Sequence, residues 1–86
     1  MRVVIMKSAD APGSAGLSFE EQVESVLKHI PETWMQYPQD AAGKTAIINM
    51  EHNEFRAACS EESKAHELVH LAAACKYLWE ELNDDK

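Results

Sequence analysis

Residues 61–82 read Glu-Glu-Ser-Lys-Ala-His-Glu-Leu-Val-His-Leu-Ala-Ala-Ala-Cys-Lys-Tyr-Leu-Trp-Glu-Glu-Leu, and this stretch decides the fold. Ser60 stands before it as a favourable N-cap, and two glutamates fill the first turn, where negative charge stabilises a helix. Apolar residues then recur at helical spacing, so we predict a helix over 61–82. From Leu68 to Cys75 the stretch is apolar on nearly every side, which predicts burial against several neighbours.

The residues before this stretch predict a second helix over 45–59. Its apolar side chains fall on about one third of the helix circumference, and they are Ile47, Ile48, Phe55 and Ala58. The break at Ser60 is short. Two helices with apolar faces and a short connection are expected to pack as an antiparallel hairpin.

A third helix is predicted nearer the N-terminus, over residues 18–30. It begins with a capping box, since Ser18 is followed three residues later by Glu21, and it stops at a proline. Residues 31–44 are expected to be an ordered loop that Trp34 anchors by packing.

Together these elements predict an all-α fold, a small helical bundle in a single domain over residues 1–86. Residues 1–17 are predicted to be an extended arm and linker, in which the β-branched residues 2–6 can form a short strand. A chain this short buries little surface alone, and helix 61–82 is apolar on more sides than two helices can cover. We therefore expect oligomerisation, most simply a homodimer, to complete the bundle.

Charge and cysteine content limit the classes of function. The net charge of −7 repels phosphate backbones and argues against nucleic-acid binding.

The apolar N-terminus is too short for a signal sequence, and no apolar run approaches a membrane span, so we expect no membrane partner and a cytoplasmic location. The two cysteines, Cys59 and Cys75, are expected to be reduced, buried thiols, and Trp79 is expected to pack on the helix seam.

Two pairs of polar residues lie three apart on the two predicted helices: Glu51-x-x-Glu54 and Glu67-x-x-His70. At that spacing both members of a pair point to one side of a helix. Glu51 and Glu67 fall within the apolar faces, with Glu54 and His70 at the margins. Converging carboxylates repel one another, and a divalent cation would remove that conflict. Oxygen ligands suit Mg²⁺, and a histidine also admits Mn²⁺, Fe²⁺ or Zn²⁺.

A purely structural interpretation is the alternative. The acids can instead pair with basic side chains at the edges of a packed face, for which the candidates are Lys44, Arg56, Lys64 and Lys76. A histidine in an apolar stretch is commonly a hydrogen-bonded core residue rather than a ligand. Under this interpretation the seam holds no metal.

The same residues resemble the signature of the MazG-like all-α NTP pyrophosphohydrolases, which is EExxE, a gap, and then ExxD. This chain reads Met50-Glu51-His52-Asn53-Glu54, a gap of 12 residues, and Glu67-Leu68-Val69-His70. The resemblance covers residues 45–82. Met50 stands where the family has its first glutamate, and His70 where it has aspartate.

The resemblance implies that Glu51, Glu54 and Glu67, with His70 in the aspartate's place, bind Mg²⁺, which carries the triphosphate of a nucleotide; Mn²⁺ is the alternative ion. It also implies basic side chains that steady the phosphates. The foremost candidates for that role are Lys44 and Arg56.

Three functions follow as hypotheses. The first is a divalent-metal-dependent nucleoside triphosphate pyrophosphohydrolase, in which Glu54 or Glu51 orients the attacking water as a catalytic residue. The second is a non-catalytic helical binding or structural module of a small accessory or phage-derived protein. The third is a carboxylate-bridged di-metal bundle, in which a dimer brings together two Glu67-x-x-His70 units.

Overall fold

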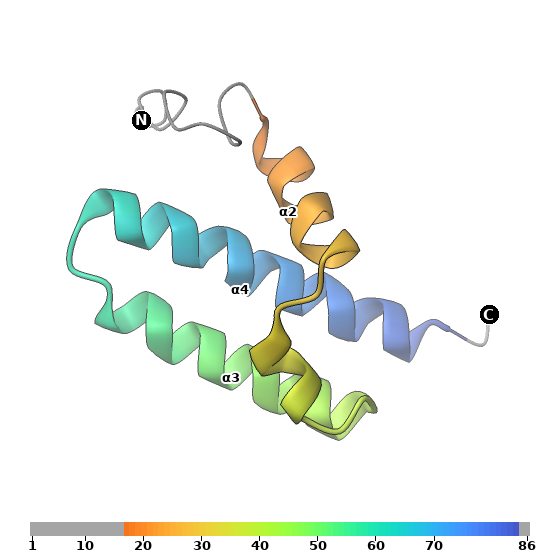
Figure 1. Cartoon of the computed structure of the whole chain (residues 1–86). Helices are drawn as coiled ribbons and strands as arrows, with labels where there is room; N and C mark the ends of the chain where they lie inside the picture. Colours follow the sequence, from red (N-terminus) through yellow and green to blue (C-terminus); the bar gives the residue numbers. More distant parts are fainter. Residues whose placement is uncertain (1–16, 85–86) are drawn as a thin grey trace.

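The computed structural model describes residues 17–84, which are helical apart from their connections (Figure 1). In chain order the elements are α2 (Phe19–Lys28), the 3₁₀ helix η1 (Glu32–Gln36), α3 (Ala41–Ala57) and α4 (Glu61–Leu82). No strand occurs within residues 17–84, so the predicted all-α class is confirmed. The predicted arm, linker and short strand fall outside the described residues, apart from Leu17 at their edge.

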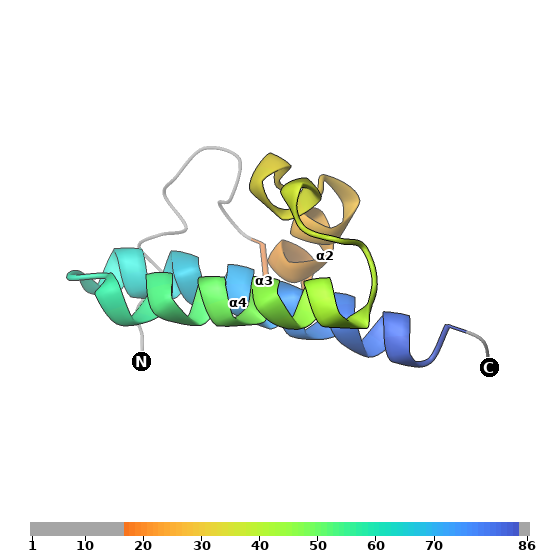
Figure 2. The same cartoon turned by 90° about the horizontal axis from the view of Figure 1, so that it is seen from below.

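The helices form two layers. Helices α3 and α4 lie side by side as one layer, and α2 and η1 cover the same side of it (Figures 1 and 2). The core lies between the layers and draws on every element; its members are Val23, Trp34, Ile47, Ala73 and Ala74. The two alanines are fully buried on α4, where small side chains allow close approach of the neighbouring helices.

Two helix starts agree with the capping patterns. The Ser18 hydroxyl accepts a hydrogen bond from the Glu21 amide at 3.1 Å, and the Ser18 amide donates to the Glu21 carboxylate at 2.9 Å. Ser60 caps α4 in the same way, and α4 has the predicted bounds. Helix α2 ends at Lys28, two residues before the predicted end at residue 30, because the approach to a proline disfavours helical backbone.

The start of α3 corrects the predicted bounds of 45–59. The helix begins at Ala41, because the Asp40 side chain accepts a hydrogen bond from the Gly43 amide at 2.8 Å and so caps the helix. Gly43 is required there by close packing, since a Cβ atom on it would lie 1.8 Å from the Pro38 carbonyl oxygen. The predicted loop over 31–44 therefore holds both η1 and the first turn of α3.

The exposure of several side chains also differs from expectation. Trp34 is fully buried, which confirms that it anchors its segment, but Trp79 is 62 % exposed and does not pack on the seam. Cys59 and Cys75 are free and exposed rather than buried. For Trp79 and Cys75 the reason is that helical periodicity defines the faces of α4 but does not show which of them its neighbours cover. Cys59 is exposed because α3 ends at Ala57, two residues before the predicted end at residue 59, so that Cys59 lies in the connection to α4.

Candidate metal site

Three carboxylates meet where α3 and α4 lie side by side. Glu51 and Glu54 come from α3, one turn apart, and Glu67 comes from α4. One oxygen from each carboxylate lies within 4.8 Å of the other two. The predicted meeting of these three carboxylates is confirmed, while their binding of a metal stays a prediction.

Glu51 is the innermost member of this carboxylate cluster. Its side chain is 3 % exposed, and its Oε2 accepts a hydrogen bond of 2.7 Å from the indole N–H of Trp34. Its other oxygen, Oε1, is buried with no hydrogen-bond partner among the described residues. A buried carboxylate oxygen without a partner costs free energy of folding. Oε1 is therefore available to accept a hydrogen bond or to bind a cation.

Glu54 is the outermost member of the cluster, and its surroundings disfavour its charge. Partial burial at the helix seam raises the pKa of Glu54 above its usual value of 4.5, and the negative charges of Glu51 and Glu67 raise it further. A hydrogen bond between the Glu54 and Glu67 side chains acts in the same direction, while nearby His70 opposes it. The cluster therefore favours a bound proton or another positive charge.

His70 lies at the margin of the cluster, one turn along α4 from Glu67. It is not part of the set within 4.8 Å. Its Nδ1–H donates to the His66 carbonyl oxygen at 3.1 Å, because a carbonyl can only accept. That bond leaves Nε2 as the ring nitrogen able to bind a metal. Its ring also contacts the His66 ring, with centroids 4.5 Å apart.

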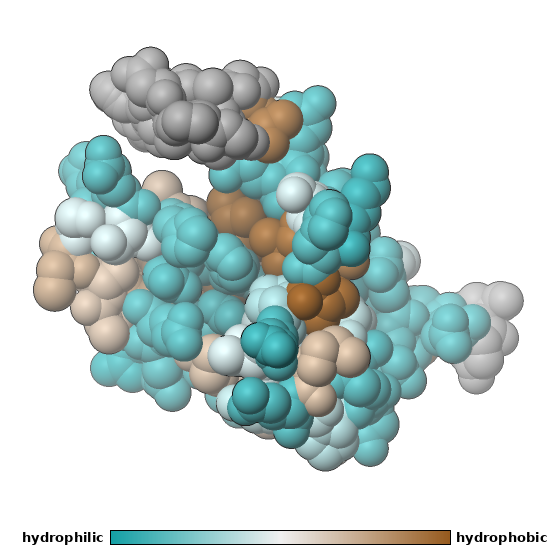
Figure 3. All heavy atoms as spheres, viewed as in Figure 1, coloured by the Kyte–Doolittle hydropathy of each residue, from teal (hydrophilic) through white to brown (hydrophobic). Residues whose placement is uncertain are grey.

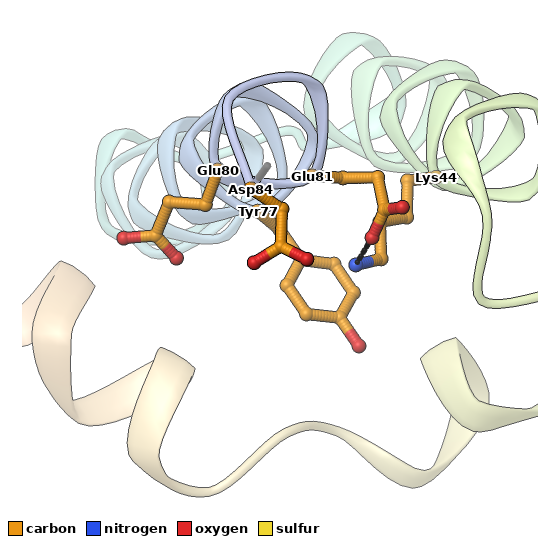
Figure 4. Close-up of a pocket in the computed structure, with 5 residues that line it drawn as sticks. All are labelled: Lys44, Tyr77, Glu80, Glu81 and Asp84. Atoms are coloured by element: carbon orange, nitrogen blue, oxygen red, sulfur yellow. Dashed lines mark hydrogen bonds and ion pairs between the residues drawn. The ribbon is translucent and has the colours of Figure 1, made fainter. Parts of the chain in front are cut away.

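The three lysines named by the structural interpretation are engaged elsewhere. Lys44 is buried, pairs with Glu81 at 2.9 Å, and places its ammonium group 4.1 Å from the centre of the Tyr77 ring (Figure 4). Lys76 pairs with Glu24 on α2, and Lys64 lies over the Phe55 ring. The predicted pairing of the seam acids Glu51 and Glu67 with these lysines is therefore wrong.

The two predicted phosphate contacts are not assembled with the cluster in the described residues. Lys44 lies two turns of α3 before Glu51, roughly 10 Å along the helix axis, and its charge is already paired with Glu81. Arg56 is exposed near the end of α3. Their contact with a nucleotide stays a prediction.

Sequence reasoning did not identify Trp34 as part of the site. It found the anchoring role of Trp34 but not its partner, because Glu51 lies 17 residues further along the chain. A single signal was present: a tryptophan that packs in a core needs an acceptor for its indole N–H.

The raised pKa of Glu54 predicts the pH dependence of the metal-free protein. In the native state Glu54 holds its proton more tightly than in the unfolded chain, so its stabilising contribution is fully present below pH 4.5 and is lost as the pH rises through the native pKa. Melting curves recorded in a chelator across this range should show that loss. The Glu54→Gln variant should lack this component, and identical pH profiles for the variant and the wild type would contradict the assignment.

Comparisons with protein-family models, with curated proteins and with solved structures found no match to the chain. Among the helices within residues 17–84, none has the length and apolar character needed to cross a membrane.

Proposed function

We propose that the chain is a divalent-cation-binding protein of the MazG-like NTP pyrophosphohydrolase type, with Glu51, Glu54 and Glu67 as the metal ligands and His70 at the margin. The observation that carries this proposal is that Glu51, whose buried Oε1 has no hydrogen-bond partner in the described residues, lies beside two further carboxylates. Three carboxylates this near to one another cannot easily all stay ionised without a cation. Carboxylate oxygens are the ligands that Mg²⁺ and Mn²⁺ prefer.

The residues of the chain fit such a group. Glu51 is held by Trp34 with one oxygen free, and Glu54 is solvent-accessible, so the cluster has a rigid inner side and an open outer side. An open side is needed if phosphate oxygens are to reach a bound ion. When bound, a divalent cation supplies charge that polarises a phosphate and acidifies water. Glu54, at the open side, is the carboxylate best placed to orient that water.

Nucleoside triphosphates are the proposed substrate class, and this step depends on the resemblance over residues 45–82. The wild-type chain with millimolar Mg²⁺ or Mn²⁺ should release pyrophosphate and a nucleoside monophosphate from one or more nucleotides. Glu54→Gln should reduce the rate by at least about tenfold, as changes at a metal site do. Glu80→Gln removes the same charge from an exposed position further along α4 and should leave the rate unchanged.

Two results would separate the hypotheses. Metal binding without pyrophosphate release would favour a non-catalytic module. The pairing of Lys44 with Glu81 supports that alternative, because it occupies a predicted phosphate contact. If there were neither metal binding nor release, the enzymatic proposal would fail entirely.

We also propose that the α3–α4 pair is an antiparallel hairpin whose bundle is completed by self-association. Several large apolar side chains are exposed, among them Phe19, Leu68 and Leu82. Figure 3 shows apolar surface at the start of α2 and again near its crossing with α4, among hydrophilic residues. A shallow hollow of about 200 Å³ between these helices is lined in part by Phe19, Val23 and Ala72. Sedimentation at micromolar concentration that detects only a 9.6 kDa species would contradict self-association.

A further inference from the structure

Trp34 contacts the carboxylate cluster through a single oxygen. Its indole N–H donates to Glu51 Oε2 at 2.7 Å, and both side chains are almost fully buried. A tryptophan N–H can only donate, and it makes one such bond. One oxygen of Glu51 is thus committed to Trp34, and the other, Oε1, remains without a partner in the described part of the chain.

Trp34 has little freedom to release that oxygen. Its carbonyl accepts a hydrogen bond of 3.0 Å from the Gln39 side chain, which also accepts a hydrogen bond from the Tyr77 hydroxyl. The Tyr77 ring lies against Trp34, with centroids 5.4 Å apart. The Lys44 ammonium group, paired with Glu81, lies 4.1 Å from the centre of the Tyr77 ring (Figure 4).

This arrangement bears on which cation the cluster would accept. Ca²⁺ takes six to eight oxygens and readily uses both oxygens of one carboxylate, whereas Mg²⁺ demands octahedral geometry with short bonds to single oxygens. The hydrogen bond from Trp34 fixes the Oε2 side of Glu51 and leaves Oε1 as the oxygen without a partner, and one free oxygen suits the smaller ions. We propose that Trp34 is a positioning residue that restricts Glu51 to binding through Oε1 and so makes the cluster prefer Mg²⁺ and Mn²⁺ to Ca²⁺. This inference rests on the cation site proposed above.

The first test compares two tryptophan variants. Trp34→Phe removes the N–H and keeps an aromatic ring in the core. Trp79→Phe is the matched control, because Trp79 is largely exposed and the same atoms are removed. We expect Mn²⁺ affinity to fall about tenfold in Trp34→Phe, with Ca²⁺ affinity unchanged or higher, and the Trp79→Phe control to bind both ions like the wild type. An unchanged ratio of Mn²⁺ to Ca²⁺ affinity in Trp34→Phe would overturn the inference while leaving the cation site intact.

The second test uses the wild-type chain and does not depend on the variant folding well. The two tryptophans give two indole N–H signals in a nitrogen-15 NMR spectrum, and Trp79→Phe identifies that of Trp34 by difference. On saturation with Mg²⁺ the Trp34 signal should shift and still exchange slowly with water, because its bond to Oε2 persists. The Trp79 signal should stay in place.

Two other results of the NMR experiment would contradict the proposed role of Trp34. Fast water exchange at the Trp34 indole in the Mg²⁺-bound protein would show that Glu51 turns both oxygens to the ion, and the inference would be wrong. If neither Mg²⁺ nor Mn²⁺ at millimolar concentration changed any signal, the proposed cation site would fail, and the role of Trp34 in it would fail as well.

Discussion

Saturating Mg²⁺ or Mn²⁺ should raise the melting temperature of the wild-type chain by roughly 10–20 °C. An ion that binds only the native state stabilises it by about 2.7 kcal/mol when present at a hundred times its dissociation constant. The binding set, Glu51, Glu54 and Glu67, exists as a set only when α3 and α4 are packed together. The unfolded chain should therefore gain little from the ion.

The Glu54→Gln variant makes this prediction specific. It should lose the gain from metal, while its metal-free form should be no less stable than the wild type, because one negative charge is removed from a repelling set. Glu80→Gln should retain the full gain. No shift in the wild type at millimolar metal, or an equal shift in Glu54→Gln, would count against the cluster as the binding site.

Trp34→Ala should destabilise the metal-free protein by about 3–5 kcal/mol. The indole is fully buried between α3, α4 and its own segment, so its removal leaves a large cavity. It also leaves the second oxygen of Glu51 without its hydrogen-bond donor. For a domain of this size such a loss is a large fraction of the free energy of unfolding.

Urea titration in a chelator measures this loss directly. Trp79→Ala is the control, and since Trp79 is mostly exposed it should change the free energy of unfolding by no more than about 0.5 kcal/mol. If the two substitutions had similar effects, Trp34 would not be the anchor of the core that its burial indicates.

Local signals made much of the fold predictable. Ser18 and Ser60 cap their helices where the capping patterns predict, because an N-cap hydrogen bond joins residues only three apart in the sequence. The start of α3 was not predicted, since Pro38 and Gly43 make that segment look like a loop. Its Asp40 cap is also a local pattern, since the bond to the Gly43 amide spans three residues, whereas the close approach of the Pro38 carbonyl depends on how the segment folds back.

The candidate site was predictable only in part, for a similar reason. The spacing of Glu51, Glu54 and Glu67 on helical faces indicated that their carboxylates meet, and they do. The donor to Glu51 and the partner of Lys44 were not predictable, because both contacts join segments far apart in the sequence. Periodicity places a residue on a face of its own helix, whereas the choice of partner depends on tertiary packing.

Direct titration of Mn²⁺ by electron paramagnetic resonance, in which free and bound ions give different signals, tests the central claim most directly. We expect one Mn²⁺ bound per wild-type chain, displaced by Mg²⁺. That binding should be lost in the Glu51→Gln/Glu54→Gln double variant, whose helical content by circular dichroism should be unchanged. Binding of Mn²⁺ that survives in a folded double variant, or its absence from the wild type, would contradict the assignment of these carboxylates as a metal site.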